Sequence, residues 1–275
     1  ETERKENPLD FALWKAAKEG EVSWDSPWGP GRPGWHIECS VMATEILGDT
    51  IDIHGGGADL EFPHHTNEIA QSEAKTGKTF ANYWMHNGFV NVDNEKMSKS
   101  LGNFVTVHDM LQTVDGQVLR FFLATQQYRK PINFTEKAIH DAEVNLKYLK
   151  NTHSLPLTEQ VNQAELQTYL DAFQEAMDDD FNTANGVTVL FDMAKWINSG
   201  NYDQTVKDAF EKMLQVFGIV FEEEVLDEDI EKLIEERQAA RANKDFATAD
   251  RIRDELAAQG IKLLDTKEGV RWTRD

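Results

Sequence analysis

Hydrophobic positions follow two different periods along this chain. In the N-terminal part, short apolar runs end at glycines and predict, in order, a helix over 37–47, a short buried strand over 50–53, a helix over 64–75 and strand-like segments within 80–92. This order of strand, glycine turn and helix is typical of a doubly wound α/β domain, where ligands bind at the carboxyl ends of strands. Before it, Trp14, Trp24 and Trp28 lie among prolines and glycines, which predicts a long irregular connection packed by aromatic side chains.

Beyond residue 105 the pattern becomes helical. Thr106 and Asp109 have the spacing of a helix-capping pair. An apolar stripe then recurs at intervals of three and four residues and consists of Ile139, Ala142, Leu146 and Leu149. Such a stripe predicts a helical bundle, which the pattern continues over 159–218.

The C-terminal residues predict a small separate unit. An acidic run over 221–229 is a plausible hinge. After it we expect two helices and a hairpin, assigned to residues 228–243, 246–259, 260–264 and 270–272, with the hairpin turn at 267–269.

Composition limits the class of protein. A chain of 275 residues with 40% hydrophobic content can bury a sizeable core and suggests about two domains. No apolar run reaches the length of a membrane span, and one cysteine excludes an intrachain disulfide framework and suits the reducing cytosol. The net charge of −21 argues against a nucleic-acid partner, but basic residues gather in the last forty or so positions and can form a local RNA-binding face. The alternative is that they are solvated helix faces with partners one turn away.

Lys96 to Ser100 form a compact cationic segment. Two lysines and two serines lie within these five residues, directly after the turn-prone Asp93-Asn94-Glu95. Ammonium groups and hydroxyl donors can stabilise the charge that develops on a leaving pyrophosphate. The segment therefore points to nucleotide chemistry, with an exposed basic loop as the alternative.

Cys39, His64 and Glu68 have the character of metal ligands. His64 and Glu68 are four residues apart, so on a helix both side chains leave the same face. Cys39 supplies a thiolate from another helix, and thiolate with imidazole favours zinc over magnesium or calcium. His65 points about 100° away from His64 on a helix and is left out of the ligand set. A buried cysteine beside a surface His–Glu pair is the alternative.

Several segments together resemble cysteinyl-tRNA synthetase, a class I aminoacyl-tRNA synthetase. They are Gly34-Trp35-His36-Ile37-Glu38-Cys39, Asp52 to Asp59, Phe62 to Gln71, Lys96 to Ser100, Asp180-Phe181-Asn182-Thr183 and Gly269-Val270-Arg271-Trp272. The resemblance covers essentially the whole chain. One departure is that the His-Ile-Gly-His type signature of this class is missing, and His54-Gly55 is not that motif. We therefore expect the C-terminal part of a longer enzyme, incomplete for catalysis by itself.

The resemblance implies a fold that is α/β plus all-α. Part of a class I, Rossmann-like catalytic domain would be followed by a helical bundle and a small α+β C-terminal domain. The expected domains are residues 1–104 for the catalytic part with the lysine loop, 105–155 for a stem-contact helical region, 156–225 for a DALR-type tRNA-binding bundle and 226–275 for anticodon binding.

The family also implies roles for the site residues. One Zn²⁺ per chain would be held by Cys39, His64 and Glu68, with a fourth ligand, a second cysteine, outside this sequence. Zinc would bind the thiolate of the substrate and reject serine without an editing site. Trp35 would pack on the amino acid, with a buried core aromatic as the alternative.

For ATP, which carries Mg²⁺, the family assigns the phosphates to the lysine loop. Lys99 is the main catalytic residue, with Lys96 in support and Ser98 beside them. Gly56 would allow the backbone to come close to the nucleoside, and Asp59 would accept hydrogen bonds from the ribose hydroxyls.

The reaction implied is attack by the L-cysteine carboxylate on the α-phosphate of ATP, then transfer of cysteine to tRNA(Cys). Arg241, Asp250 and Asp265 occupy positions that read anticodon bases in the family, and Trp272 would either stack on a base or fill the hairpin core. Two other functions compete: a ligase of the mycothiol type that joins cysteine to an amino sugar, and a non-catalytic tRNA-binding fragment. We expect a cytoplasmic monomer with no membrane partner.

Overall fold

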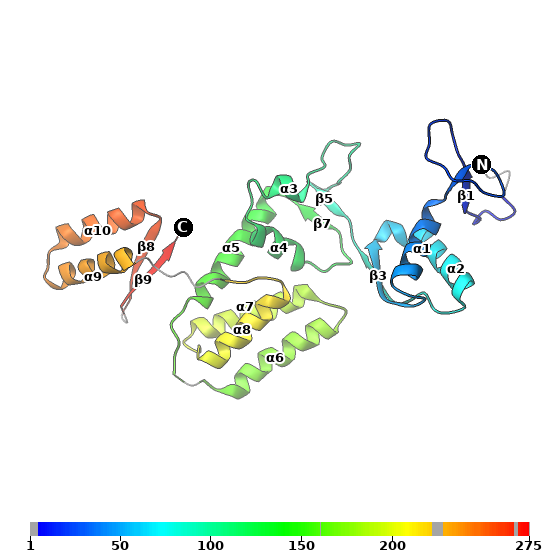
Figure 1. The fold of residues 1–275 in the computed structure, drawn as a ribbon. Coiled ribbons are helices and arrows are strands. Elements are labelled where there is room, and N and C mark those ends of the chain that lie inside the picture. The colour runs from blue at the N-terminus through cyan, green and yellow to red at the C-terminus, as the bar shows by residue number, and fades with distance from the viewer. Residues whose placement is uncertain (1–4, 160, 222–227, 267–268, 275) are drawn as a thin grey trace. The chain divides into compact units, whose positions relative to one another are not determined.

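The computed structural model describes residues 5–159, 161–221, 228–266 and 269–274. The chain divides into two compact units, residues 1–220 and 221–275, which are described separately (Figure 1). Within the described ranges, the helices all lack the combination of length and apolar character that crossing a bilayer requires.

The first unit opens with an α/β section. Its main elements are β1 Trp14–Ala16, β2 Gly31–Pro33, α1 Trp35–Ile46, β3 Ile51–Gly57, α2 Thr66–Thr76 and β4 Ala81–Asn87. β3 and β4 pair in parallel, with Ile51 opposite Ala81, and α2 is the crossover helix between them. Ile51, Phe80 and Ala81 form a small buried core against which α1, α2 and β4 pack Ala43, Ile69 and Trp84. The α/β order that the sequence predicts is confirmed.

The two predicted helices of this section form with small changes. Gly48 follows α1 with a φ of 100°, and Gly77 ends α2 with a φ of 69° while its N–H bonds to the carbonyl of Glu73. Both positions need the left-handed backbone that glycine adopts without strain. The expected start of the second helix at His64 is wrong, because residues Glu61–His65 form a π-helical turn before α2 begins at Thr66.

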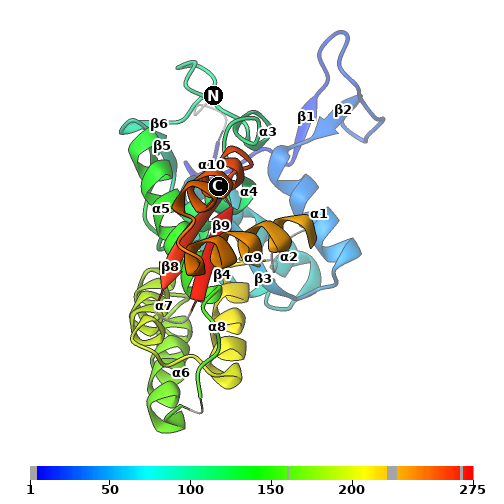
Figure 2. The same ribbon diagram turned by 90° about the vertical axis from the view of Figure 1, so that its left-hand side faces the viewer.

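Two expectations about the N-terminal part are wrong. The strand expected at 50–53 runs on to Gly57 and is buried at Ile51 alone among its described residues, since Ile53 is 59% exposed. Backbone pairing with β4 extends β3 through its glycines, while β4 is its one partner in the described sheets. Two of the three tryptophans expected to pack the opening stretch do not, because Trp24 and Trp28 are 56% and 80% exposed. Trp14 is half-buried with a buried indole nitrogen, on β1, which pairs with β2 in an antiparallel ribbon leading into α1 (Figure 2).

The lysine segment lies on a second, smaller sheet. Its strands are β5 Val90–Val92, β6 Glu95–Lys96 and β7 Ile132–Phe134, in the order β6-β5-β7. β5 pairs antiparallel with β6 and parallel with β7. Asp93 and Asn94 turn the β5–β6 hairpin with φ values of 48° and 69°, which is the geometry of a tight hairpin turn. The sheet therefore holds Lys96 at the end of β6 and fixes the start of the loop that carries Lys99.

Helices make up the rest of the first unit. They are α3 Val107–Met110, α4 Gly116–Ala124, α5 Glu136–His153, α6 Gln163–Asp178, α7 Thr183–Asn198 and α8 Gln204–Val216. Thr106 caps α3 by accepting from the N–H of Asp109 at 3.0 Å, as its spacing predicts. The expected stripe on α5 is confirmed, with Ala142, Leu146 and Leu149 buried where α5 packs on α7 and α8. A bundle of helices thus follows the α/β section, as expected.

A polar joint links the bundle to the segment before β7. Asp180, in the turn between α6 and α7, accepts from the Tyr128 hydroxyl at 2.8 Å and pairs with Arg129. The hydroxyl of Thr183 donates to the carbonyl of Gln126 at 2.8 Å. Arg129 and Tyr128 hold the pKa of the Asp180 carboxyl below its usual value. The Asp180-to-Thr183 motif therefore serves as a contact between two parts of the first unit.

The second unit is a helix pair with a hairpin. It contains α9 Glu228–Ala242, α10 Phe246–Ala258, β8 Ile261–Thr266 and β9 Gly269–Arg274, with the two strands antiparallel. Its core consists of Ile230, Ile252, Leu256 and Ile261. Trp272 packs against that core, which favours its role as a filler of the hairpin. The expected helices and hairpin are confirmed, while most of the acidic run and the turn at 267–268 lie outside the described residues.

Candidate functional site

The three expected metal ligands converge. One ligand atom each from Cys39, His64 and Glu68 lies within 4.8 Å of the other two. Cys39 comes from α1, His64 from the π-helical turn and Glu68 from the first turn of α2, and α1 packs directly on α2. His64 and Glu68 are buried, and Cys39 is half-buried. The packing of α1 on α2 thus brings Cys39 next to His64, which lies 25 residues further along the chain.

Glu68 offers one carboxylate oxygen to a cation. Its Oε2 is 2.7 Å from Nε2 of His54 and is hydrogen-bonded to it. Its Oε1 is 2.7 Å from Nε2 of His64, but this pair lacks hydrogen-bond geometry, and no other group in the described residues donates to this buried oxygen. An unsatisfied buried carboxylate oxygen is costly. A metal ion between Oε1, the His64 nitrogen and the Cys39 sulfur would remove that cost, so the donor set fits zinc.

The ring of His64 is held from two sides. Its Nδ1 lies 2.7 Å from Nδ1 of His36, so one of the two nitrogens donates to the other. The indole of Trp35 stacks on the His64 ring, with centroids 4.1 Å apart. A metal-binding histidine usually has its second nitrogen in such a hydrogen bond, which fixes the ring. Trp35 is 57% exposed, so the alternative that it is a buried core aromatic is wrong.

The protein groups around the site disfavour positive charge on His36 and His65 and negative charge on the Cys39 sulfur. Burial raises the pKa of the Cys39 thiol, and the carboxylates of Glu68 and Glu38 raise it further. Burial lowers the pKa of His65 to about 4, with His54 and His86 acting in the same direction. His65 is therefore neutral at pH 7, and the thiol needs a nearby cation to ionise readily.

Sequence reasoning missed His36 and His54 as parts of this site. A usable signal exists, because five of the eight histidines fall between positions 36 and 86, namely His36, His54, His64, His65 and His86. His54 also lies in a strand of a parallel pair, and the carboxyl ends of such strands are where ligands gather.

His65 belongs to a second group of possible ligands. Together with His54 it shares Glu68, and the three ligand atoms again lie within 4.8 Å of one another. His65 is outside the Cys39 group, as expected. Its Nδ1 lies 2.8 Å from Nε2 of His86, so this neutral ring already has a partner.

Gly56 of β3 is required by the protein's own packing, whereas the neighbour of Gly57 is an exposed side chain that can move. A Cβ on Gly56 would lie 2.9 Å from the ring of His65, and one on Gly57 would lie 2.6 Å from the carboxylate of Asp59. Gly56 therefore leaves room for the ring of His65, in addition to any role that this glycine has in nucleotide binding. Asp59 is exposed just after β3, in a position open to solvent.

The lysines of the loop rest on aromatic rings. Nζ of Lys96 is 4.0 Å from the centroid of Phe89, and Nζ of Lys99 is 5.6 Å from that of Phe104. Such cation–π contacts are weak when exposed to solvent. Both lysine side chains are on exposed residues, so they can turn toward an anion.

Asn103 spans the loop. Its Oδ1 accepts from the N–H of Ser98 at 2.9 Å, and its Nδ2 donates to the carbonyl of Lys96 at 3.3 Å. The Ser98 hydroxyl lies 3.2 Å from that of Ser100. These contacts shape the backbone between the two lysines while leaving the ammonium groups unrestrained.

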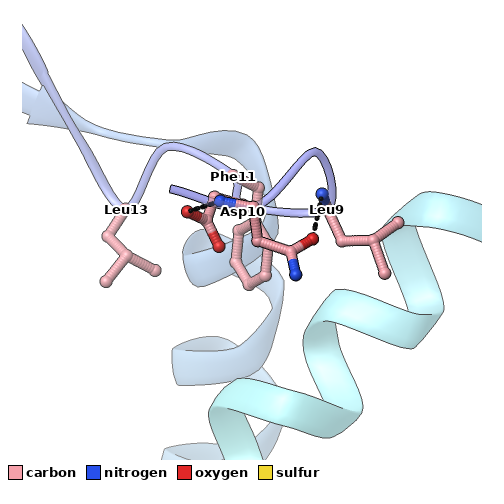
Figure 3. A pocket seen from close by; sticks show the side chains of 5 residues that line it. Leu9, Asp10, Phe11 and Leu13 are labelled. Carbon is pink, nitrogen blue, oxygen red and sulfur yellow. Dashed lines mark hydrogen bonds between the residues drawn. The ribbon is translucent and has the colours of Figure 1, made fainter. Parts of the chain in front are cut away.

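A pocket of about 590 Å³ lies near the N-terminus, open to solvent (Figure 3). Its lining residues are Asn7, Leu9, Asp10, Phe11 and Leu13. The Asp10 carboxylate and the Asn7 amide oxygen accept from backbone N–H groups at 3.0 and 2.9 Å, so these oxygens are already engaged. Phe11 packs edge-on against His36 with centroids 5.5 Å apart. One lining residue, Phe11, thus packs on His36, while the polar oxygens of the pocket are already used within the protein.

In the second unit, Arg241 and Asp265 meet while Asp250 pairs elsewhere. NH1 of Arg241 is 2.5 Å from Oδ2 of Asp265. Asp250 instead pairs with Arg253 at 3.1 Å. Arg251 also has a partner one turn away, Glu255 at 3.5 Å, so part of the basic face follows the alternative of ordinary helix-surface pairs.

Three known families match parts of this chain. Residues 1–144 match the family of tRNA synthetases class I (C) catalytic domain, 172–222 the DALR domain and 223–272 the cysteinyl-tRNA ligase anticodon binding domain.

Similar curated proteins carry one name. The chain is 96% identical to cysteine–tRNA ligase of Streptococcus thermophilus strain CNRZ 1066 over all 275 residues. It is 86% identical to the Streptococcus pyogenes serotype M6 protein and 82% identical to the Streptococcus agalactiae serotype III protein of that name, again over 100% of the chain. The chain spans 62% of the length of each relative. Because the catalytic-domain match covers more than half of its residues, the chain belongs to the class I (C) tRNA synthetase family, that of the cysteine–tRNA ligases.

Proposed function

We propose that this chain takes part in cysteine–tRNA ligation, the ATP-dependent activation of L-cysteine to cysteinyl-adenylate and its transfer to tRNA(Cys). The observation that carries the proposal is the convergence of Cys39, His64 and Glu68 around an unsatisfied carboxylate oxygen. The name of the relatives at 82–96% identity supports it.

In this proposal Cys39, His64 and Glu68 hold one Zn²⁺. A bound zinc ion supplies a borderline-soft Lewis acid that favours a thiolate over a hydroxyl. An apolar pocket gains only about 1–3 kcal/mol from so small a change in a substrate. Trp35 is stacked on His64 and exposed, so it can pack on a bound amino acid. His36 and His54 hold the ligands in place.

The lysine loop is proposed to hold the phosphates of ATP, which enters with Mg²⁺. Lys99 and Lys96 would leave Phe104 and Phe89 for the phosphate oxygens, with Ser98 as a further donor. Gly56 and Asp59 are proposed on the nucleoside side. Positioning and electrostatic stabilisation carry most phosphoryl-type transfers, so no general base is assigned.

The helical parts are proposed to bind tRNA. The division at residues 105–155, 156–225 and 226–275 keeps its three roles of stem contact, DALR-type bundle and anticodon binding. Arg241, Asp250 and Asp265 are the proposed anticodon contacts. The match of residues 223–272 to an anticodon-binding family favours this function over the amino-sugar ligase. We further propose a monomer in the cytoplasm.

The experiment uses the full-length protein, since the chain spans 62% of its relatives. We expect about one zinc per chain by elemental analysis, cysteine-dependent ATP–pyrophosphate exchange, and charging of tRNA(Cys). Chelation of the metal should remove exchange, and added Zn²⁺ should restore it. Full-length protein that binds no zinc when Zn²⁺ is supplied, or that keeps full exchange after its metal is removed, would contradict the proposal. Exchange without tRNA charging would favour the amino-sugar ligase.

A further inference from the structure

Arg237 is a buried arginine that none of the roles above uses. It lies on α9, one turn before Arg241, and is 5% exposed. Arginine is rarely buried unless it is paired. Its partner therefore indicates what this residue is for.

The partner of Arg237 is Asp265 on β8. NH1 of Arg237 donates to Oδ1 at 3.0 Å and NH2 donates to Oδ2 at 3.0 Å. This two-pronged pair fixes the plane of the carboxylate as well as its position. The hydrogen bonds from Arg237 lower the pKa of Asp265, and Arg241 adds to that effect, so the carboxylate stays charged.

The three side chains are graded in exposure. The side chain of Arg237 is 6% exposed, whereas those of Asp265 and Arg241 are 42% and 44% exposed. A carboxylate has about four acceptor positions. Contacts to three guanidinium nitrogens leave about one acceptor position on the Asp265 carboxylate for a ligand, next to the half-exposed guanidinium of Arg241.

A buried ion pair is by itself weak evidence for a stabilising role. Replacing a buried ion pair by well-packed apolar side chains is often neutral or stabilising. The Nε of Arg237 is also buried without a hydrogen-bond partner among the described residues, which adds a cost. A buried arginine kept at this cost is consistent with a role in fixing the position of Asp265.

We propose that Arg237 is a positioning residue, which locks Asp265 so that Asp265 and Arg241 present an acceptor and a donor at fixed spacing to the edge of an unstacked anticodon base. Both a donor and an acceptor are needed to tell one base edge from another. This inference rests on the proposed anticodon contacts of the second unit.

The test compares full-length wild-type protein with Arg237→Lys and Arg237→Met. Lysine keeps the charge but cannot make the two-pronged pair, and methionine fills a similar volume without charge. We expect kcat/KM for tRNA charging, normalised to pyrophosphate exchange of the same preparation, to fall about 10–100-fold. The ratio of charging between tRNA(Cys) and transcripts with single anticodon substitutions should shrink in both variants. Arg251→Lys, on the exposed face of α10, is the matched control and should keep both values.

A further variant tests whether Arg237 acts through Asp265. Asp265→Asn combined with Arg237→Lys should charge no worse than Asp265→Asn alone, because the positioned group is already altered. If Arg237→Lys lowers only the unfolding temperature while charging and anticodon discrimination stay at the wild-type level, the inference is wrong and Arg237 is structural. Wild-type protein that does not charge tRNA(Cys) would instead overturn the proposed function together with this inference.

Discussion

Glu68 is 1% exposed, with a histidine nitrogen 2.7 Å from each of its oxygens, whereas Lys96 and Lys99 are exposed and rest on the rings of Phe89 and Phe104. The first arrangement offers donors to a cation, and the second offers ammonium groups to an anion. They also differ in rigidity. Helices and a paired strand hold the acceptors around Glu68, while a loop carries Lys99.

The difference indicates when each site is ordered. Folding already fixes the side chains around Glu68, so binding a metal costs little further conformational entropy. In the proposed function the lysines would exchange aromatic rings for phosphate, and that ordering would take place when the nucleotide binds. Amino-acid choice would thus depend on a rigid site, and catalysis on a movable one.

The largest effect is expected for Lys99→Ala. Loss of one donor aimed at developing charge typically lowers the rate about 10²–10³-fold. Pyrophosphate exchange by the full-length protein should fall by that factor while zinc content stays unchanged. Lys195→Ala, on the surface of α7 and paired with Asp192, is the control and should have no effect. Loss of zinc in Lys99→Ala would mean that the two regions are not independent.

His54→Phe should have the next largest effect, a loss of zinc affinity at the site around Glu68. Phenylalanine can keep the stacking of this position on Trp84, at 4.6 Å between centroids, but loses the hydrogen bond to Glu68. Removing such an outer partner typically lowers metal affinity about 10–100-fold. Competition with a chelator measures it, and His86→Phe, which loses a contact to His65 instead, is the control. Unchanged zinc affinity in His54→Phe would show that Glu68 does not depend on His54 for its orientation.

Asn103→Ala should have a smaller effect, confined to the loop. The backbone N–H of Ser98 and carbonyl of Lys96 would lose their partner, at about 1 kcal/mol net, which corresponds to about a fivefold lower exchange rate. Asn103→Asp keeps the acceptor for Ser98 and should lie between alanine and wild type. Equal rates for all three proteins would mean that the shape of the loop is set elsewhere.

Phe104→Leu should have the smallest effect and the opposite sign. An exposed cation–π contact contributes about 0.5–1 kcal/mol, so its loss frees Lys99 and should raise apparent ATP affinity about two- to fivefold. The KM for ATP in pyrophosphate exchange measures it. A weaker affinity in Phe104→Leu would show that Phe104 helps the bound state of the loop.

Local chemistry made much of this fold predictable. Gly77 ends α2 because a left-handed residue is needed there, and Thr106 caps α3 through its own hydroxyl. These signals act over a few residues and can be read from the sequence. The helices and hairpin of the second unit follow from periodicity in the same way.

What escaped prediction depends on contacts between distant segments. Trp28 is a large apolar residue of the kind usually buried, but it can be buried only if another segment packs on it. The hydrophobic pattern of the sequence does not show whether such a segment is present. The ligand trio was predicted by residue type and resemblance, whereas His54 was missed because only the pairing of β3 with β4 next to α2 brings it to Glu68. The lysine loop was predicted as a motif, but its rest position on Phe89 and Phe104 is a property of packing.

The joint at Asp180 limits how this protein can be divided. Tyr128, Arg129 and Gln126 hold the turn at 180–183, so the helices that follow are anchored by residues well upstream of them. A recombinant fragment that begins at the apparent boundary near residue 156 would leave a carboxylate and a threonine hydroxyl without their partners. A shorter fragment of this protein, or a transfer of its helical bundle to another scaffold, should therefore include residues 126–129 together with the helices.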